Sequence, residues 1–321
     1  AKNFDALIDL IDDYPEMLLF CSDDKHPDNL ALSHINELVC RAVAKGKNVF
    51  DVLRAACINP ILHYDLPVGQ LREGDGADFI VVQDLEKFEV LSTYIRGEKV
   101  AENGKTRIPR VNNEVINHFH TSIKSPTDFQ IQAQGKQVRV IEALDGQLIT
   151  PEIQGEILVQ EGFAFSNPAK DILKITVVNR YQDAPPALAF IKNFGVKEGA
   201  IASSVGHDSH NIIAVGVDDA SICRAVNLLI EAKGGVSAVW GDQEEVLPLP
   251  VGGIMSPEDG YEVAAAYTQI DRMAKAMGST LNSPFMTLSF MALLVIPDLK
   301  LSDKGLFDGK KFGFTDVFKG R

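Results

Sequence analysis

The sequence predicts an α/β protein with more than one domain, on three observations. Its 321 residues are enough for two domains of about 150 residues each. Hydrophobic residues make up 45% and charged residues 23% of the chain, which is typical of a globular protein and excludes disordered, collagen-like and coiled-coil chains. Strand-length apolar runs accompany amphipathic helical patterns over residues 1–66 and again beyond a polar connector at 111–130.

The first segment, residues 1–66, has the helix–strand–helix order of a parallel α/β unit. Its apolar spacing predicts a helix, a fully buried strand and two further helices, over residues 4–13, 17–21, 31–45 and 49–58. The last helix is expected to stop before Asn59, because Pro60 cannot continue a helix interior.

The character of the chain changes after Pro67. Turn residues at 68–78 lead into a predicted strand at 79–82, and a hairpin is expected over 89–101. Residues 67–110 are therefore interpreted as a small β unit, and 111–130 as a polar connector.

Residues 131–321 are expected to form a second globular α/β domain. Strands are predicted at 137–143, 156–159, 172–178, 212–217 and 236–240. Helices are predicted at 221–232 and 257–277. The apolar segment 284–296 is too short to span a bilayer, so it is expected to pack in the core.

Charge and cysteine use restrict the partners and the compartment. The formal net charge is −13, which repels phosphate backbones and anionic lipid, so nucleic acid and membranes are poor partners. No apolar run approaches the length of a membrane span, and the first residues lack a secretory signal pattern. The 4 cysteines are far apart, which is typical of buried thiols in a reducing compartment, by default the cytoplasm.

The first candidate site is Ser22-Asp23-Asp24, directly after the predicted buried strand. In a parallel α/β barrel, catalytic groups lie at the carboxyl ends of the strands. A carboxylate here is a candidate metal ligand or general base. The alternative is that Asp23 or Asp24 caps the helix beginning near Pro27.

The second candidate is the run His207-Asp208-Ser209-His210-Asn211, before another buried strand. Two histidines three residues apart can converge on one site, where Asp208 and Asn211 orient the rings or bind polar ligand edges. The alternative is a polar loop whose histidines satisfy local backbone groups.

The pair His118 and His120 has the H-x-H spacing of metal-binding strands. Because no buried strand leads into it, a solvated linker is the favoured interpretation. Other signatures are absent: the sequence has no P-loop, no dinucleotide-binding glycine motif and none of the zinc nucleobase-deaminase pattern.

Several segments resemble bacterial adenine deaminases of the amidohydrolase superfamily. In the first part of the chain the similar segments are Leu19–Pro27, His34–Val39, Val52–Ala56, Gly74–Phe79 and Tyr94–Gly97. In the second part they are Gly199–Val205, His207–Asn211, Leu247–Pro250 and Ser283–Ala292. The resemblance covers essentially the whole chain.

This resemblance implies a fold for each segment. Residues 1–66 would be the last βα unit of a metal-dependent (β/α)8 barrel, and 67–110 would supply strands of a small β-sandwich. After the connector, 131–321 would be the separate α/β C-terminal domain of that family. Family members are longer, and their upstream H-x-H, bridging carboxylate and later barrel histidines have no counterpart here.

The implied activity is hydrolysis of adenine to hypoxanthine and ammonia in purine salvage, with water activated by manganese or iron. Asp23 stands where the superfamily places its metal-binding, proton-accepting aspartate, and Asp24 and His26 are candidate substrate contacts. We add the hypothesis that His207, Asp208 and His210 contact substrate as part of a lid facing the Ser22–Asp28 loop.

The expected partners are adenine, further copies of the chain and an N-terminal segment of the same enzyme. Since Asp23 is the only superfamily ligand found, the isolated chain is expected to be inactive. The alternative function is a non-catalytic C-terminal fragment for folding, dimerisation or covering the substrate.

Overall fold

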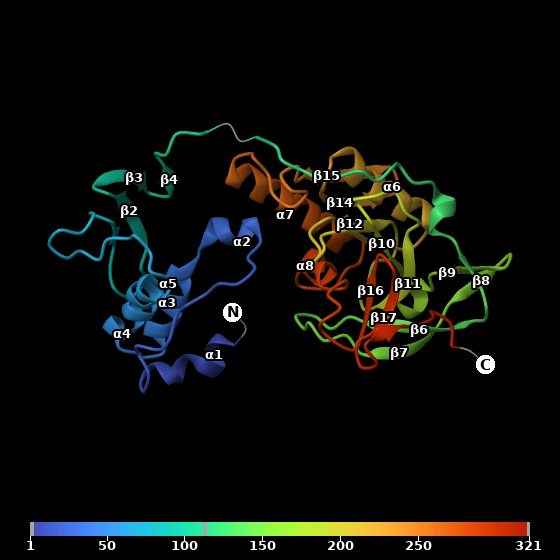
Figure 1. The fold of residues 1–321 in the computed structure, drawn as a ribbon, viewed down its shortest axis with the longest axis horizontal. Coiled ribbons are helices and arrows are strands. Elements are labelled where there is room, and N and C mark those ends of the chain that lie inside the picture. The colour runs from blue at the N-terminus through green and yellow to red at the C-terminus, as the bar shows by residue number, and fades with distance from the viewer. Residues whose placement is uncertain (1–2, 112–113, 320–321) are drawn as a thin grey trace. The chain divides into compact units, whose positions relative to one another are not determined.

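The computed structural model describes residues 3–111 and 114–319. The chain divides into two compact units, Ala1–Asn112 and Asn113–Arg321, which are described separately (Figure 1). None of the helices in the described residues is long and apolar enough to cross a membrane.

The first unit begins with short helices around a small apolar core. The helices are α1 (Phe4–Leu7), α2 (Pro27–Leu32), α3 (Ile35–Ala44), α4 (Val49–Leu53) and α5 (Asn59–Tyr64). A 3-10 turn at Ile8–Ile11 extends α1. Its core joins Ile11, Ala42, Val52 and Ala55, none more than 1% exposed. The helical spacing of these apolar residues places them on the inward faces.

The predicted strand at 17–21 is wrong. Met17 is 77% exposed, and the segment has no strand conformation. A β-strand needs a neighbouring ladder, and no strand of the described residues pairs with this one. Instead, the Phe20 N–H donates to the carbonyl oxygen of Ala55 at 3.2 Å. An apolar run alone therefore did not make a strand.

Two helix predictions also need correction. The helix expected over 31–45 is interrupted at Ser33 and His34, between α2 and α3. The helix expected to stop before Asn59 continues as α5, because a π-helical turn at Arg54–Ile58 precedes it and Pro60 lies in its first turn. Proline is tolerated there, since its missing N–H has no helical acceptor.

The β unit agrees with its prediction. It is an antiparallel sheet of β1 (Phe79–Val82), β2 (Val90–Ile95), β3 (Glu98–Glu102) and β4 (Lys105–Thr106), in that order. The Asp78 carboxylate accepts hydrogen bonds from the N–H groups of Gly69 at 2.8 Å and Arg96 at 2.7 Å. These bonds lower the pKa of Asp78 and join the turn-rich entry to the hairpin.

The second unit is organised around one mixed sheet. In spatial order its strands are β15 (Gln243–Pro248), β14 (Gly235–Trp240), β12 (Ala200–Ser203), β13 (Ile212–Gly216), β10 (Ile172–Val178), β11 (Ala187–Lys192), β6 (Gln137–Glu142) and β7 (Glu152–Glu156). All neighbours are antiparallel except β11 and β6, which are parallel.

Helices cover both faces of this sheet. On one face Ala200, Ala202 and Ala214 pack with α6 (Asp219–Glu231). On the other, Ile201 and Ile213 pack with α7 (Gly260–Ala276) and α8 (Pro284–Ser289). Alternate residues of a strand point to opposite faces, so strands buried on both sides appear in the sequence as continuous apolar runs.

Two smaller sheets complete the unit. One consists of β5 (Ile131–Gln132), β9 (Phe163–Phe165) and β8 (Leu158–Gln160), and the other of β16 (Leu299–Ser302), β17 (Gly305–Asp308) and β18 (Gly313–Phe314). The strand predicted at 156–159 is divided between the end of β7 and β8. Strands β11 and β15 of the large sheet were not predicted, and neither were β5, β9, β16, β17 and β18 of the smaller sheets.

The connector is better anchored than a solvated linker would be. Phe119 and Phe129 are buried at 7% and 0% exposure. A 3-10 turn at Pro126–Phe129 is capped by Ser125 and Asp128. His118 and His120 are exposed, as expected for a solvated linker, and only the burial of the two phenylalanines was not predicted, because isolated aromatic residues in a polar stretch carry no periodic signal.

Candidate functional site

The loop after residue 21 places Asp23 at the surface of the first unit. Asp23 has φ +56°, a left-handed conformation that aspartate tolerates better than most residues. Its Oδ1 accepts the N–H of Asp24 at 2.7 Å, and Oδ2 has no partner among the described residues. The N-cap of α2 is His26, whose side chain makes no capping bond. Asp23 therefore supports the local turn and does not cap α2.

Neighbouring side chains tie this loop to the start of α3. The Ser22 hydroxyl lies 3.0 Å from Nε2 of His34. Lys25 donates through Nζ to the carbonyl of Ser33 at 2.6 Å and to Glu37 at 3.3 Å. Hydrogen bonds from Ser33 and then Lys25 lower the pKa of Glu37. Sequence spacing did not indicate that His34 lies beside Ser22, because twelve positions separate the two residues.

Within residues 3–111 and 114–319 no group of three or more His, Cys, Asp or Glu side chains is arranged to hold a metal ion. His118 and His120 are exposed, and their ring centroids lie 6.3 Å apart. Asp23 therefore has no companion ligand set in the described part of the chain.

The loop between β12 and β13 brings two predicted histidines together. The rings of His207 and His210 have centroids 5.7 Å apart, and His207 stacks on Phe290 at 4.5 Å. The His207 N–H donates to the carbonyl of Ser289 at 2.8 Å. Nδ1 of His210 accepts the N–H of Gly206 at 3.2 Å. Both histidines are half-buried. The two predicted alternatives are therefore both present: the histidine rings lie close together, and the loop also bonds to nearby backbone groups.

Below this loop lies Arg180, which the sequence reasoning missed. Its N–H donates to Oδ1 of the buried Asn211 at 3.2 Å. The hydroxyl of the adjacent Tyr181 donates to the carbonyl of Ser209 at 2.6 Å. Asp208 and Ser209 themselves are exposed. A signal was present: a polar run, residues 179–183, follows the fully buried β10.

Sheet register explains why these segments meet. Val178 at the end of β10 pairs with Ile212 at the start of β13, and Ser203 at the end of β12 pairs with Ile213. The loops that follow β10 and β12 therefore both lie at the end of the sheet where β13 begins.

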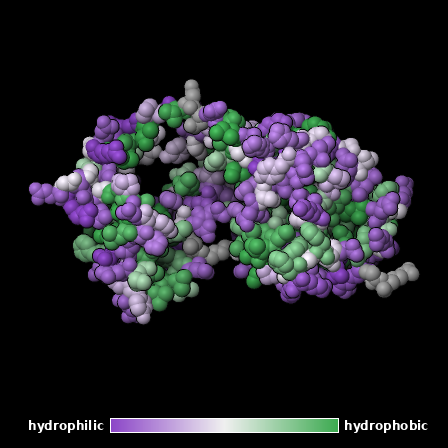
Figure 2. Space-filling view, in the orientation of Figure 1, coloured by the Kyte–Doolittle hydropathy of each residue, from purple (hydrophilic) through white to green (hydrophobic). Residues whose placement is uncertain are grey.

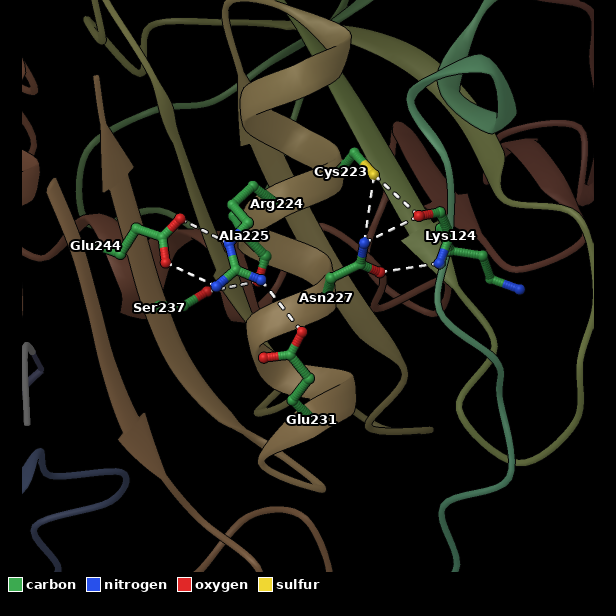
Figure 3. A network of polar contacts seen from close by, with 8 residues as sticks. All are labelled: Lys124, Cys223, Arg224, Ala225, Asn227, Glu231, Ser237 and Glu244. Atoms are coloured by element: carbon green, nitrogen blue, oxygen red, sulfur yellow. Dashed lines mark hydrogen bonds and ion pairs between the residues drawn. The ribbon is translucent and has the colours of Figure 1, made fainter. Parts of the chain in front are cut away.

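Helix α6 holds the connector against this unit (Figure 3). Oδ1 of Asn227 accepts the N–H of Lys124 at 2.9 Å, and its Nδ2 donates to the Lys124 carbonyl at 2.9 Å. The Cys223 thiol donates to the same carbonyl at 3.2 Å, and burial raises the pKa of that thiol. On the same helix, directly after Cys223, Arg224 pairs with Glu244 through two bonds of 2.6 and 2.7 Å.

The candidate residues thus form two clusters, one in each unit. Asp23, Asp24 and His26 belong to the first unit, and His207, Asp208 and His210 to the second.

Comparison with known proteins gives a family for both parts. Residues 147–313 match the adenine deaminase C-terminal domain, and residues 1–100 match the amidohydrolase family. Over 317 residues the chain is 57% identical to adenine deaminase of Sulfurovum sp. strain NBC37-1, covering 98% of this chain and 58% of that protein.

Further relatives have the same name. Adenine deaminase of Salinibacter ruber is 52% identical, with 99% of this chain and 58% of that protein covered. That of Methanosarcina acetivorans is 49% identical, with 99% and 60% covered. The chain spans about three fifths of the length of these relatives. It belongs to the adenine deaminase C-terminal domain family and carries an amidohydrolase-family segment before that domain.

Proposed function

We propose that this chain works as the C-terminal part of an adenine deaminase, which hydrolyses adenine to hypoxanthine and ammonia. The observation that carries the proposal is the 57% identity over 98% of the chain to one protein of that name. Because the chain spans 58% of that relative, the activity is assigned to the complete polypeptide. The expectation of buried thiols holds only for Cys223, because Cys21 and Cys57 are exposed and Cys40 is half-buried; cysteines that are far apart in the sequence remain the support for a reducing compartment such as the cytoplasm.

In this reaction Asp23 would transfer a proton from the attacking water to the leaving nitrogen. Its exposed carboxylate would take a proton from the attacking water while the oxygen bonds to C6 of adenine. The same proton would pass to the exocyclic nitrogen, which leaves as ammonia. An acceptor of this kind needs a carboxylate oxygen open to substrate, and Oδ2 of Asp23 has no partner among the described residues.

The proposed enzyme would use a divalent metal, manganese or iron, and most of the residues that hold this metal would lie outside this chain. The described residues do not fit such a centre, because no three metal-binding side chains come together in them. Asp23 would be one ligand of a set completed elsewhere, and no step is assigned to the metal here.

Asp24, His26 and the His207–Asn211 loop are proposed to bind the purine. Imidazole and carboxylate groups complement the ring nitrogens of adenine, and buried polar groups cost about 1–3 kcal/mol each when unpaired. Substituting His210 by alanine is expected to raise KM for adenine in the complete enzyme. An unchanged KM and kcat would remove the loop from the substrate site.

The decisive experiment uses the purified chain with adenine and Mn²⁺ or Fe²⁺, following ammonia and hypoxanthine. The chain alone is expected to bind little metal and to release no ammonia. Adding the separately expressed remainder of the Sulfurovum adenine deaminase should restore turnover. Turnover by the chain alone would refute the assignment of metal ligands to residues outside it, and no turnover in any pairing would refute adenine deamination.

The alternative is a non-catalytic module for folding, dimerisation or covering the substrate. It is favoured by the exposed hydrophobic residues of the first unit: Met17, Leu32 and Phe50 are 77%, 84% and 73% exposed. Figure 2 shows hydrophobic residues at the surface of this unit. A contiguous patch of such side chains would mark a surface that another polypeptide covers. Binding of the Sulfurovum remainder without turnover would support this alternative.

A further inference from the structure

We propose that Arg180 is the positioning residue of the His207–Asn211 loop, acting through Tyr181 and Asn211. An effect of Arg180 on catalysis rests on the proposed function, because that loop is proposed to bind the purine. Whether Arg180 holds the loop in place can be tested without adenine.

Arg180 is a buried cation without a carboxylate partner. It is 5% exposed, and among the described residues no Asp or Glu forms an ion pair with it. Nη1 donates to the carbonyl of Gly252 at 2.6 Å and Nη2 to the Tyr181 hydroxyl at 2.9 Å, while Nε is unpaired. Burying a charge in this way is costly, so an apolar residue would serve better if filling space were its only role.

Three other segments of the chain converge on this residue. Its N–H donates to Asn211 in the histidine loop, and its carbonyl accepts the N–H of His120 in the connector at 2.7 Å. The guanidinium also lies 5.8 Å from the centroid of the Phe119 ring. It reaches the Gly252 carbonyl so closely that a Cβ on Gly253 would lie 1.7 Å from Nη1.

Tyr181 carries the contact from Arg180 to the histidines. Its hydroxyl accepts from Nη2 of Arg180 and donates to the carbonyl of Ser209 at 2.6 Å. Ser209 lies between His207 and His210 in the sequence, so this bond fixes the backbone from which both rings project. The guanidinium polarises the hydroxyl, and a charge-assisted chain of this kind is stronger than separate neutral bonds.

The test is amide hydrogen exchange on the 321-residue chain and three variants. Arg180→Lys keeps the charge but replaces the rigid fork, in which separate nitrogens reach Gly252 and Tyr181, by a single nitrogen. Tyr181→Phe removes the hydroxyl, and with it both the bond to Ser209 and the acceptor for Nη2 of Arg180, but leaves the bond from Nη1 to Gly252 in place. Arg224→Lys is the matched control, because it alters an arginine of the same unit that pairs with Glu244.

Arg180→Lys should accelerate exchange about tenfold at the N–H groups of His207, His210 and Gly252, as expected for losing a hydrogen bond to a charged group. Tyr181→Phe should accelerate His207 and His210 about fivefold and leave Gly252 unchanged. The control should change none of the three. In each variant the N–H of Ile175 in β10 reports that the sheet remains folded.

Unchanged exchange at His207 and His210 in both Arg180→Lys and Tyr181→Phe would overturn the inference. In the complete adenine-deaminating enzyme, Tyr181→Phe should raise KM more than it lowers kcat. An equal fall in kcat with unchanged KM would contradict positioning of a substrate-binding loop. If the complete enzyme does not act on adenine, the proposed function fails, while the exchange result still decides the role of Arg180.

Discussion

At the scale of single residues, Asp23 combines an exposed carboxylate with a constrained backbone. Its φ of +56° and its bond to the Asp24 N–H hold the side chain in one local arrangement. Such a turn presents a carboxylate without burying it, which suits the proton acceptor that we propose Asp23 to be.

The substitution Asp23→Asn tests this role in the complete enzyme. It keeps the shape but removes the proton acceptor, so kcat should fall by about 10²–10⁴-fold. Asp13→Asn, at another exposed aspartate of the first unit, should leave turnover unchanged. If Asp23→Asn is active and Asp24→Asn is not, the proton acceptor is Asp24.

A second prediction concerns the two adjacent glycines beside Arg180. Gly252 and Gly253 both have positive φ, +62° and +75°, but only at Gly253 would a Cβ meet Arg180. Gly253→Ala should therefore lower the free energy of unfolding by about 1–3 kcal/mol more than Gly252→Ala. Urea unfolding measures this difference, and adding Arg180→Ala should abolish most of it. Equal losses in the two single variants would contradict the close contact.

At the scale of elements, β16 contains a lysine buried in a sheet. Lys300 is 1% exposed, and its Nζ donates to the carbonyl of Leu148 at 2.7 Å. Burial lowers the pKa of Lys300 to about 8, from 10.5. Since the unfolded chain then binds more protons than the folded one between these values, stability should rise as the pH rises through this window.

Lys300→Met should remove this dependence. Compared with the variant, the wild-type chain should gain up to about 3 kcal/mol of unfolding free energy between pH 8 and 10.5. Lys304→Met, at the exposed turn after β16, should leave the pH dependence unchanged. Parallel pH profiles of the wild type and Lys300→Met, measured by urea unfolding, would show that Lys300 is not desolvated.

At the scale of the whole molecule, the two units have separate cores of unequal extent. The first unit is held by one small apolar cluster, whereas the second has the large clusters on both faces of its sheet. Because stability grows with buried apolar area, we expect the first unit to unfold before the second.

The 1 tryptophan of the chain makes this testable. Trp240 lies on β14 in the second unit, where its indole N–H donates to Glu198 at 3.0 Å. On heating, far-ultraviolet circular dichroism should show a first transition that tryptophan fluorescence does not follow. Coincident transitions by both probes would mean that the two units unfold as one.

Prediction from sequence worked best where burial was uniform. The predicted strand at 172–178 coincides with β10, all of whose residues are buried, and the predicted helix at 221–232 lies within two residues of α6. Prediction failed where the local pattern and the environment disagree. The polar strand β15 lies at a sheet edge, where exposed residues are tolerated. The apolar segment 17–21 pairs with no strand of the described residues and therefore forms none.

The sequence by itself determined the α/β class, the β unit near residues 79–101, the core strands of the second unit and the polar loop at 207–211. Local periodicity and turn chemistry suffice for these, because each depends on neighbours in the chain. Only the tertiary structure decided that Arg180 lies beneath that loop and that Ser22 meets His34. Strand register and helix packing create those contacts between distant residues, and no local pattern encodes them.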